Sequence, residues 1–219
     1  MIRPWNENIW FSPRYVINEL SVAVSKGRDL KRYEEAWICA VAFICHAKID
    51  PAEWWIQIPE NDPPDVLVMS LVPREDGKGQ YLSKIQVEVF EIREFDDEDI
   101  QASIMRKLGQ KDYSGVTVIG FVRRMTSFDH ISISEFFQKN KPKVQALFLI
   151  CFEENSTNIS LIGLFPQCIK FKEDFGLFCK TTAQKDFVEM RRAMGSQRDD
   201  NGTQDELTLI PEKDIRPKR

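Results

Sequence analysis

The chain has 219 residues, 42% of them hydrophobic, and its 34 acidic and 30 basic side chains give a formal net charge of −4. This composition is typical of one well-buried globular domain, and it excludes a global positive field that would draw the chain onto a phosphate backbone. No run of about 18 apolar residues occurs, so a soluble, cytoplasmic protein without a membrane-spanning helix is expected.

The first fifty residues predict two helices. Ser12 as N-cap before a proline, with Gly27 as the stop, predicts a helix over 13–26. Asp29 caps a second helix that runs to about Ala47. Its apolar positions recur at spacings of three and four, which indicates one buried face: Leu30, Tyr33, Trp37, Val41 and Ile44.

The middle of the chain predicts a hairpin. A short strand at 54–58 precedes an almost unbroken apolar run at 65–72, which is typical of a central strand. The glycine-containing segment 74–80 then turns the chain back into a strand at 83–92.

The second half alternates helices and strands. An acidic run at 96–99 favours the start of a helix that ends near Gly109. Further elements are predicted as strands at 116–122, 144–152 and 159–165, a short helix at 132–138, a turn at 155–158 and a closing helix at 183–194. Residues 1–194 are expected to form one domain, and the polar stretch 195–219 is expected to be a disordered tail.

The cysteines predict reduced thiols. Their number is odd and most lie inside apolar runs: Cys39, Cys45, Cys151, Cys168 and Cys179. The two histidines, His46 and His130, have no acidic or cysteine partner at metal-ligand spacing, which favours core or surface roles for them.

One pair of carboxylates carries most of the functional signal. Alternation along 83–92 separates Ile85, Val87 and Val89 from a second face with Lys84, Gln86, Glu88 and Phe90. Asp65 begins the preceding strand, so a hairpin brings Asp65 and Glu88 to the same end of the sheet. Two converging carboxylates are suitable ligands for Mg²⁺.

Pro64-Asp65, followed after the hairpin by Glu88-Val89-Phe90, resembles the motif of the restriction-endonuclease-like superfamily, the PD-(D/E)xK nucleases. The likeness covers roughly residues 29–152 as an order of elements. It implies an α/β fold with a central mixed sheet flanked by helices, and a metal site in which Asp65 and Glu88 hold Mg²⁺ or Mn²⁺. The family's lysine, which orients or activates the attacking water, is replaced by Phe90, which has no donor and no charge.

An amine from elsewhere can replace that lysine, and three polar side chains are candidates for its role. Lys84 shares the face of Glu88 but lies roughly 13 Å along the strand. Gln86 can place a water by hydrogen bonding, although an amide is no general base. Lys107, on the inward side of the following helix, is the preferred candidate.

Glu34 is a further candidate, because the resemblance implies a glutamate from the helix before the sheet. On a helical wheel Glu34 falls within the apolar stripe, and Glu35 falls at its edge. The alternative is an acid satisfied by the helix dipole or by a nearby lysine, and both interpretations stay open.

Three functions follow. The first is a metal-dependent nuclease that holds DNA or RNA through local basic clusters. The second is a catalytically inactive nuclease-like module that contacts nucleic acid or a protein partner, and the third is an unrelated α/β domain with an accidental motif. The basic clusters, which fit a solvated surface equally well, are Arg106, Lys107 and Lys111, then Arg123 and Arg124, then Lys139, Lys141 and Lys143. No oligomeric state follows from the sequence.

Overall fold

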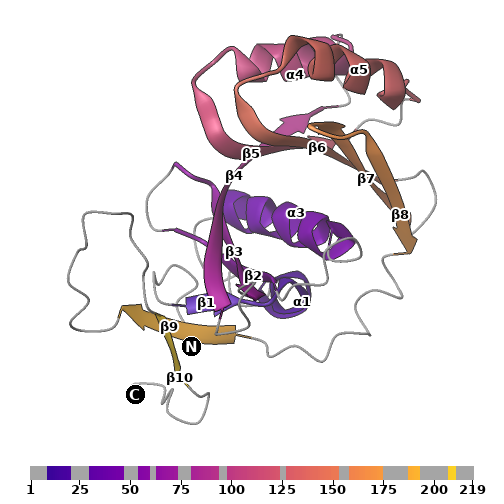
Figure 1. Ribbon diagram of the computed structural model, residues 1–219. Helices are drawn as coiled ribbons and strands as arrows, with labels where there is room; N and C mark the ends of the chain where they lie inside the picture. The colour runs from indigo at the N-terminus through magenta and orange to yellow at the C-terminus, as the bar shows by residue number, and fades with distance from the viewer. Residues whose placement is uncertain are drawn as a thin grey trace, which may run out of the picture.

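The computed structural model describes residues 9–20, 30–46, 54–59, 63–73, 80–93, 98–123, 127–152, 158–174, 187–192 and 207–210 (Figure 1). Its helical elements are α1 (Pro13–Tyr15), the π-helical η1 (Val16–Leu20), α3 (Leu30–His46), α4 (Ile100–Leu108) and α5 (His130–Asn140). Its strands are β1 (Ile9–Phe11), β2 (Trp54–Gln57), β3 (Val66–Pro73), β4 (Gln80–Ile92), β5 (Tyr113–Val122), β6 (Val144–Phe152), β7 (Asn158–Phe165), β8 (Ile169–Asp174), β9 (Phe187–Arg192) and β10 (Leu207–Ile210).

The strands form one mixed sheet in the order β10-β9-β1-β2-β3-β4-β5-β6-β7-β8. Neighbours from β2 to β4 are antiparallel, β4, β5 and β6 are parallel, and β7 and β8 return to antiparallel pairing. Parallel neighbours require a crossover, and α4 and α5 lie in the two crossovers β4 to β5 and β5 to β6. Figure 1 shows α4 and α5 together at the top of the view, with α3 on the other side of the strands. The predicted α/β fold with a mixed sheet flanked by helices is confirmed.

Apolar side chains fill both sides of this sheet. Val87 and Val89 of β4 belong to the core that α3 covers, whereas Phe90 and Ile92 pack with the core under α4 and α5. The alternation predicted for 83–92 is therefore confirmed at these positions. It follows that Glu88, between the two valines, faces the α4 side of the sheet.

Side-chain caps fix where the helices begin. The hydroxyl of Ser12 accepts a hydrogen bond of 3.1 Å from Tyr15 N, and Asp99 Oδ1 accepts one of 2.7 Å from Ala102 N. Asp129 caps α5, which starts two residues before the predicted 132–138. Within the described ranges, no helix has the length and apolar character needed to cross a membrane.

Two predicted helices differ from the structure. Only three residues of 13–26 are α-helical before the π-helical η1 begins, and 21–26 lie outside the described residues. The helix predicted at 183–194 is wrong, because Phe187–Arg192 is strand β9. β9 pairs with β1 near the N-terminus, and β10, inside the predicted tail 195–219, pairs with β9. Pairing with so distant a segment overrides local propensity.

Candidate functional site

Asp65 lies immediately before β3, at the end of the hairpin where β4 extends beyond it. Val66 pairs with Val87, so Asp65 and Glu88 are neighbours across the two strands. Asp65 Oδ2 accepts a hydrogen bond of 2.8 Å from the backbone N–H of Val89. The aspartate thereby satisfies a β4 donor at a level where β3 no longer runs beside it, and this contact holds its carboxylate at the sheet end.

Glu88 is a buried carboxylate with a cation beside it. The residue is only 4% exposed, and its Oε2 lies 2.9 Å from Nζ of Lys111, in the loop between α4 and β5. Burial alone lowers the pKa of Lys111, but the hydrogen bond and charge of Glu88, together with Tyr113 and Asp65, outweigh it, so the pKa is raised. Lys111 is therefore an ammonium at neutral pH, surrounded by both carboxylates of the candidate site.

The amine at the carboxylate is Lys111, whereas the sequence favoured Lys107. Both ammonium groups lie over the ring of buried Tyr113, Lys111 Nζ at 5.2 Å from the ring centroid and Lys107 Nζ at 5.8 Å. Of these two lysines, only Lys111 forms an ion pair with Glu88. The crossover between β4 and β5 was the sequence feature that could have identified Lys111. A parallel β5 must begin beside β4, so the residues just before Tyr113 return to β4.

Phe90, at the position of the family's lysine, is a packing residue. It is half-buried and belongs to the core under α4 and α5. A Cβ on Gly120 of β5 would lie 2.9 Å from Phe90 Cζ and 2.6 Å from Leu149 Cδ2. The ring therefore occupies space left by the missing side chain of Gly120, and the position offers no polar atom to the site.

The predicted placement of the α3 glutamates is reversed. Glu34 is exposed, so its expected place within the apolar stripe is wrong, and Glu35 is the buried one, at 7% exposure. Glu35 Oε1 lies 3.1 Å from Lys31 Nζ, and Glu34 Oε2 lies 3.4 Å from Arg123 Nη2. The alternative of an acid paired with a basic side chain thus describes both residues.

Gln86 and Lys84 remain outside the carboxylate pair. Both side chains are exposed on β4. Within the described residues, no hydrogen bond joins the amide of Gln86 to Asp65 or Glu88. The structure therefore brings Asp65, Glu88 and Lys111 together, whereas Glu34 pairs with Arg123 and Lys107 lies over Tyr113.

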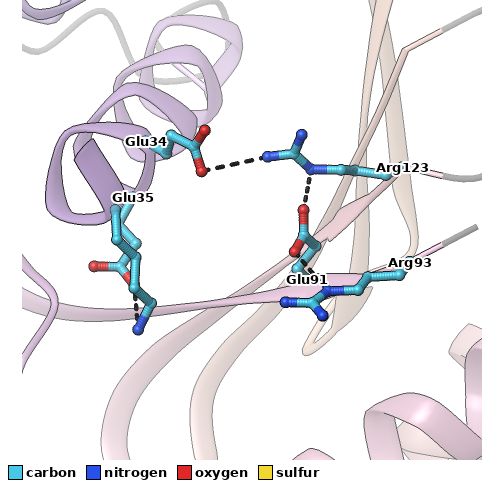
Figure 2. A network of polar contacts seen from close by, with 6 residues as sticks. Glu34, Glu35, Glu91, Arg93 and Arg123 are labelled. Carbon is cyan, nitrogen blue, oxygen red and sulfur yellow. Dashed lines mark hydrogen bonds and ion pairs between the residues drawn. The ribbon is translucent and has the colours of Figure 1, made fainter.

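A polar network lies where β4 and β5 end (Figure 2). Glu91 contacts both Arg93, at 3.0 Å, and Arg123, which also reaches Glu34 of α3. These side chains line a cleft of about 480 Å³ between α3, α4 and the strand ends. Its cationic lining consists of Lys31, Arg93, Arg106, Lys107 and Arg123. The carboxyl ends of parallel strands are where α/β proteins commonly bind ligands.

The cysteines of the described residues are free thiols, as the sequence predicts, although Cys168 is exposed and Cys179 lies outside those residues. Burial, and then the charge of Asp65, raise the pKa of Cys39 well above its usual value. Burial also raises the pKa of Cys151 to about 12. Neither thiol supplies a thiolate nucleophile at neutral pH.

No group of three or more histidine, cysteine, aspartate or glutamate residues is close enough to hold an ion within the described residues. A Mg²⁺ site needs only one or two carboxylates, since waters and substrate phosphates complete the coordination. No protein-family model matches the chain, and no curated protein resembles it significantly in sequence.

Proposed function

We propose that the protein hydrolyses phosphodiester bonds of nucleic acid with Mg²⁺ or Mn²⁺ as cofactor, within a restriction-endonuclease-like core. The order α3, β2, β3, β4, α4, β5, with an antiparallel meander followed by a parallel strand, supports this core. Asp65 and Glu88 would hold the metal. Lys111, from the loop after α4, would take the place that Phe90 leaves without an amine.

The observation that carries the proposal is a cation among carboxylates. The ammonium of Lys111 contacts Glu88 and is stabilised by the charge of Asp65. A position that favours one positive charge from two converging carboxylates also favours a hard divalent ion, which prefers oxygen ligands. The donor set therefore fits Mg²⁺ or Mn²⁺.

The chemistry divides between the metal and the side chains. A bound divalent ion lowers the pKa of its water and polarises a phosphoryl oxygen. Lys111, which pairs with Glu88 as an ammonium, would act as a positive charge and not as the base that takes the proton. A fixed ammonium at that place stabilises the negative charge that develops on the phosphate.

A second function, a nuclease-like module without catalysis, is favoured by Phe90 and by the closed Glu88–Lys111 pair. Phe90 supplies packing at the motif position, and the pair neutralises the buried carboxylate without any metal. In that case the protein would bind nucleic acid or a protein partner through its basic side chains. Cleavage and metal binding separate the two functions.

The cleavage test uses labelled single- and double-stranded DNA and RNA with Mg²⁺ or Mn²⁺. Wild type is expected to cut at least one of these substrates, and Asp65→Asn, Glu88→Gln and Lys111→Met are expected to lose activity by about a hundredfold or more. Glu135→Gln, which removes an exposed carboxylate on α5, is the matched control and should retain activity. Cleavage that survives Asp65→Asn and Glu88→Gln would remove the proposed site.

Calorimetric titration with Mn²⁺ tests the metal site independently of cleavage. Lys111 competes with the ion for Glu88, so Lys111→Met should bind Mn²⁺ more tightly than wild type while failing to cut. Glu88→Gln should bind more weakly than either. Metal binding without cleavage in wild type supports the inactive module, and absence of heat that is unchanged in Lys111→Met argues against the metal site and therefore against the hydrolase.

A further inference from the structure

The charged cleft begins on the same strand segment as the carboxylate pair. Val89 and Phe90, which directly follow Glu88 in β4, both line it. On the α4 side, the ring of Tyr113 joins the two places, because Lys111 of the candidate site and Lys107 of the cleft lie over the same ring. A substrate strand that reaches Glu88 therefore has the cleft as its immediate neighbour.

The carboxylates of the cleft orient its guanidinium groups. Glu91 accepts from Arg93 and from Arg123, as Figure 2 shows, and Arg123 is further held by Glu34 and by stacking on Phe121. Arg123 directly follows β5 and Arg93 directly follows β4, so the two guanidinium groups converge from adjacent strand ends. Guanidinium groups fixed in this way are suited to planar, bidentate contacts with phosphate oxygens.

Lys107 adds a positive charge that the cleft does not neutralise. Its ammonium lies over Tyr113, and no carboxylate of the described residues forms an ion pair with it. The side chain is half-buried on α4, one turn before the loop that carries Lys111. A half-buried ammonium at the wall of a cleft gains most from an anionic ligand, because water screens it only in part.

We propose that this cleft binds a phosphate group of the nucleic-acid strand, next to the phosphate at Asp65, Glu88 and Lys111. Lys107, Arg93 and Arg123 would contact that phosphate, and the glutamates would keep the arginines in position. This inference rests on the proposed function and adds a positioning site to it. The phosphate can belong to the interior of the strand or to its end.

The test is fluorescence anisotropy of a short labelled single-stranded DNA in EDTA, where binding is measured without cleavage. Lys107→Gln is expected to raise Kd about three- to tenfold and to lower the slope of log K against log salt by about 0.7, the value for one lost phosphate contact. Lys170→Gln, which removes an exposed lysine of β8, is the matched control and should change neither. Arg93→Gln is a second variant should Lys107→Gln fold poorly.

Two substrate arms identify the source of the phosphate. Oligonucleotides with a 5′-phosphate, a 3′-phosphate or neither are compared in wild type and Lys107→Gln. A Lys107-dependent gain from one end phosphate assigns the cleft to a strand end, and an equal loss on all three assigns it to the interior. Equal Kd values and salt slopes for Lys107→Gln, Arg93→Gln and Lys170→Gln would overturn the proposal, as would wild type that does not bind.

Failure of this proposal and failure of the proposed function give different results. If the cleft does not bind phosphate, Asp65→Asn still abolishes cleavage while Lys107→Gln binds and cuts like wild type. If the carboxylate pair is not catalytic, Asp65→Asn cuts like wild type while Lys107→Gln still weakens DNA binding in EDTA. When both are correct, Lys107→Gln raises KM more than it lowers kcat, because it removes binding and not the reacting groups.

Discussion

Two ion-pair systems on β4 differ in burial although they start three residues apart. The side chain of Glu88 is 5% exposed and faces one cation, Lys111, whereas that of Glu91 is 31% exposed and is shared between Arg93 and Arg123. A buried charge that loses its partner costs several kcal/mol, but an exposed pair contributes about 0–1 kcal/mol. Ion pairs of the same residue types therefore contribute differently to the free energy of unfolding at the two places.

The difference in burial separates two kinds of site. The Glu88–Lys111 pair stays closed, whereas the exposed pairs of Glu91 leave their arginines accessible to an anion. Burying a carboxylate costs free energy unless a cation accompanies it, so Glu88 depends on its contact with Lys111. In the cleft, water already screens the pairs, and a ligand anion would contact the arginines at small cost while the glutamates keep them in position.

The largest effect on stability is expected for Lys111→Met. The substitution leaves Glu88 buried without a cation, and breaking a buried pair costs about 3–5 kcal/mol. Because Lys111 itself is 43% exposed, we expect a loss of about 2–3 kcal/mol in the free energy of unfolding, below that range. Urea unfolding at neutral pH measures it.

The double variant Glu88→Met/Lys111→Met is the control for that experiment. It removes both charges and replaces them with apolar groups, a change that is often neutral for a buried pair. The double variant should therefore be more stable than Lys111→Met alone. If the single variant is as stable as wild type, Glu88 does not depend on Lys111 and the contrast with the cleft disappears.

A smaller loss is expected for Gly120→Ala, which probes why the motif position holds Phe90. The added methyl would meet Leu149 and Phe90 at less than ordinary contact distance. Overpacking typically costs about 1–3 kcal/mol, and we expect the lower half of that range because both neighbours are side chains that can shift. Gly109→Ala is the matched control, since its methyl has only ordinary contacts and its backbone φ is negative. Equal stability of the two variants would mean that Phe90 does not depend on Gly120.

The sequence predicted those parts of the molecule that local patterns determine. The cap at Ser12, the helix start after the acidic run 96–99, the alternation along β4 and the neighbouring carboxylates all follow from local patterns. β1 and β9 were missed because they pair with each other across most of the length of the chain. Lys111 was missed for a related reason, since its contact with Glu88 depends on how the crossover returns to the sheet.

Glu34 shows a different limit of the sequence, because an ideal helical wheel assigned the buried face one residue too early. The wheel centred its stripe on Trp37 and Ile44, which are only half-buried, while Ala36, Cys39 and Ala40 face the core fully. Small residues that allow close packing against the sheet thus outweighed the larger apolar ones in orienting α3. The burial of Glu35 follows from that rotation.

Alkaline pH should weaken the buried pair selectively. The pKa of Lys111 in the folded protein is raised above its usual 10.5, so the stabilisation is complete below the unfolded pKa and is lost as pH rises through the folded one. The stability difference between wild type and Lys111→Met should therefore be constant near neutral pH and should shrink above about pH 10.5. Urea unfolding across that range measures it, with Gly109→Ala, which changes no titratable group, as the control whose difference from wild type stays flat. A difference that grows with pH would contradict the ion pair.

The smallest change in stability is expected for Arg123→Gln, in the exposed network. Arg123 and its partners Glu34 and Glu91 are 45%, 56% and 31% exposed, so water screens the ion pairs, and the lost stacking on Phe121 is the main cost. We expect the free energy of unfolding to fall by less than about 1 kcal/mol. The same variant should weaken DNA binding in EDTA about as much as Lys107→Gln, because it removes a guanidinium from the cleft. Large loss of stability with unchanged DNA affinity would instead make Arg123 a structural residue, and the two ion-pair systems would then be alike.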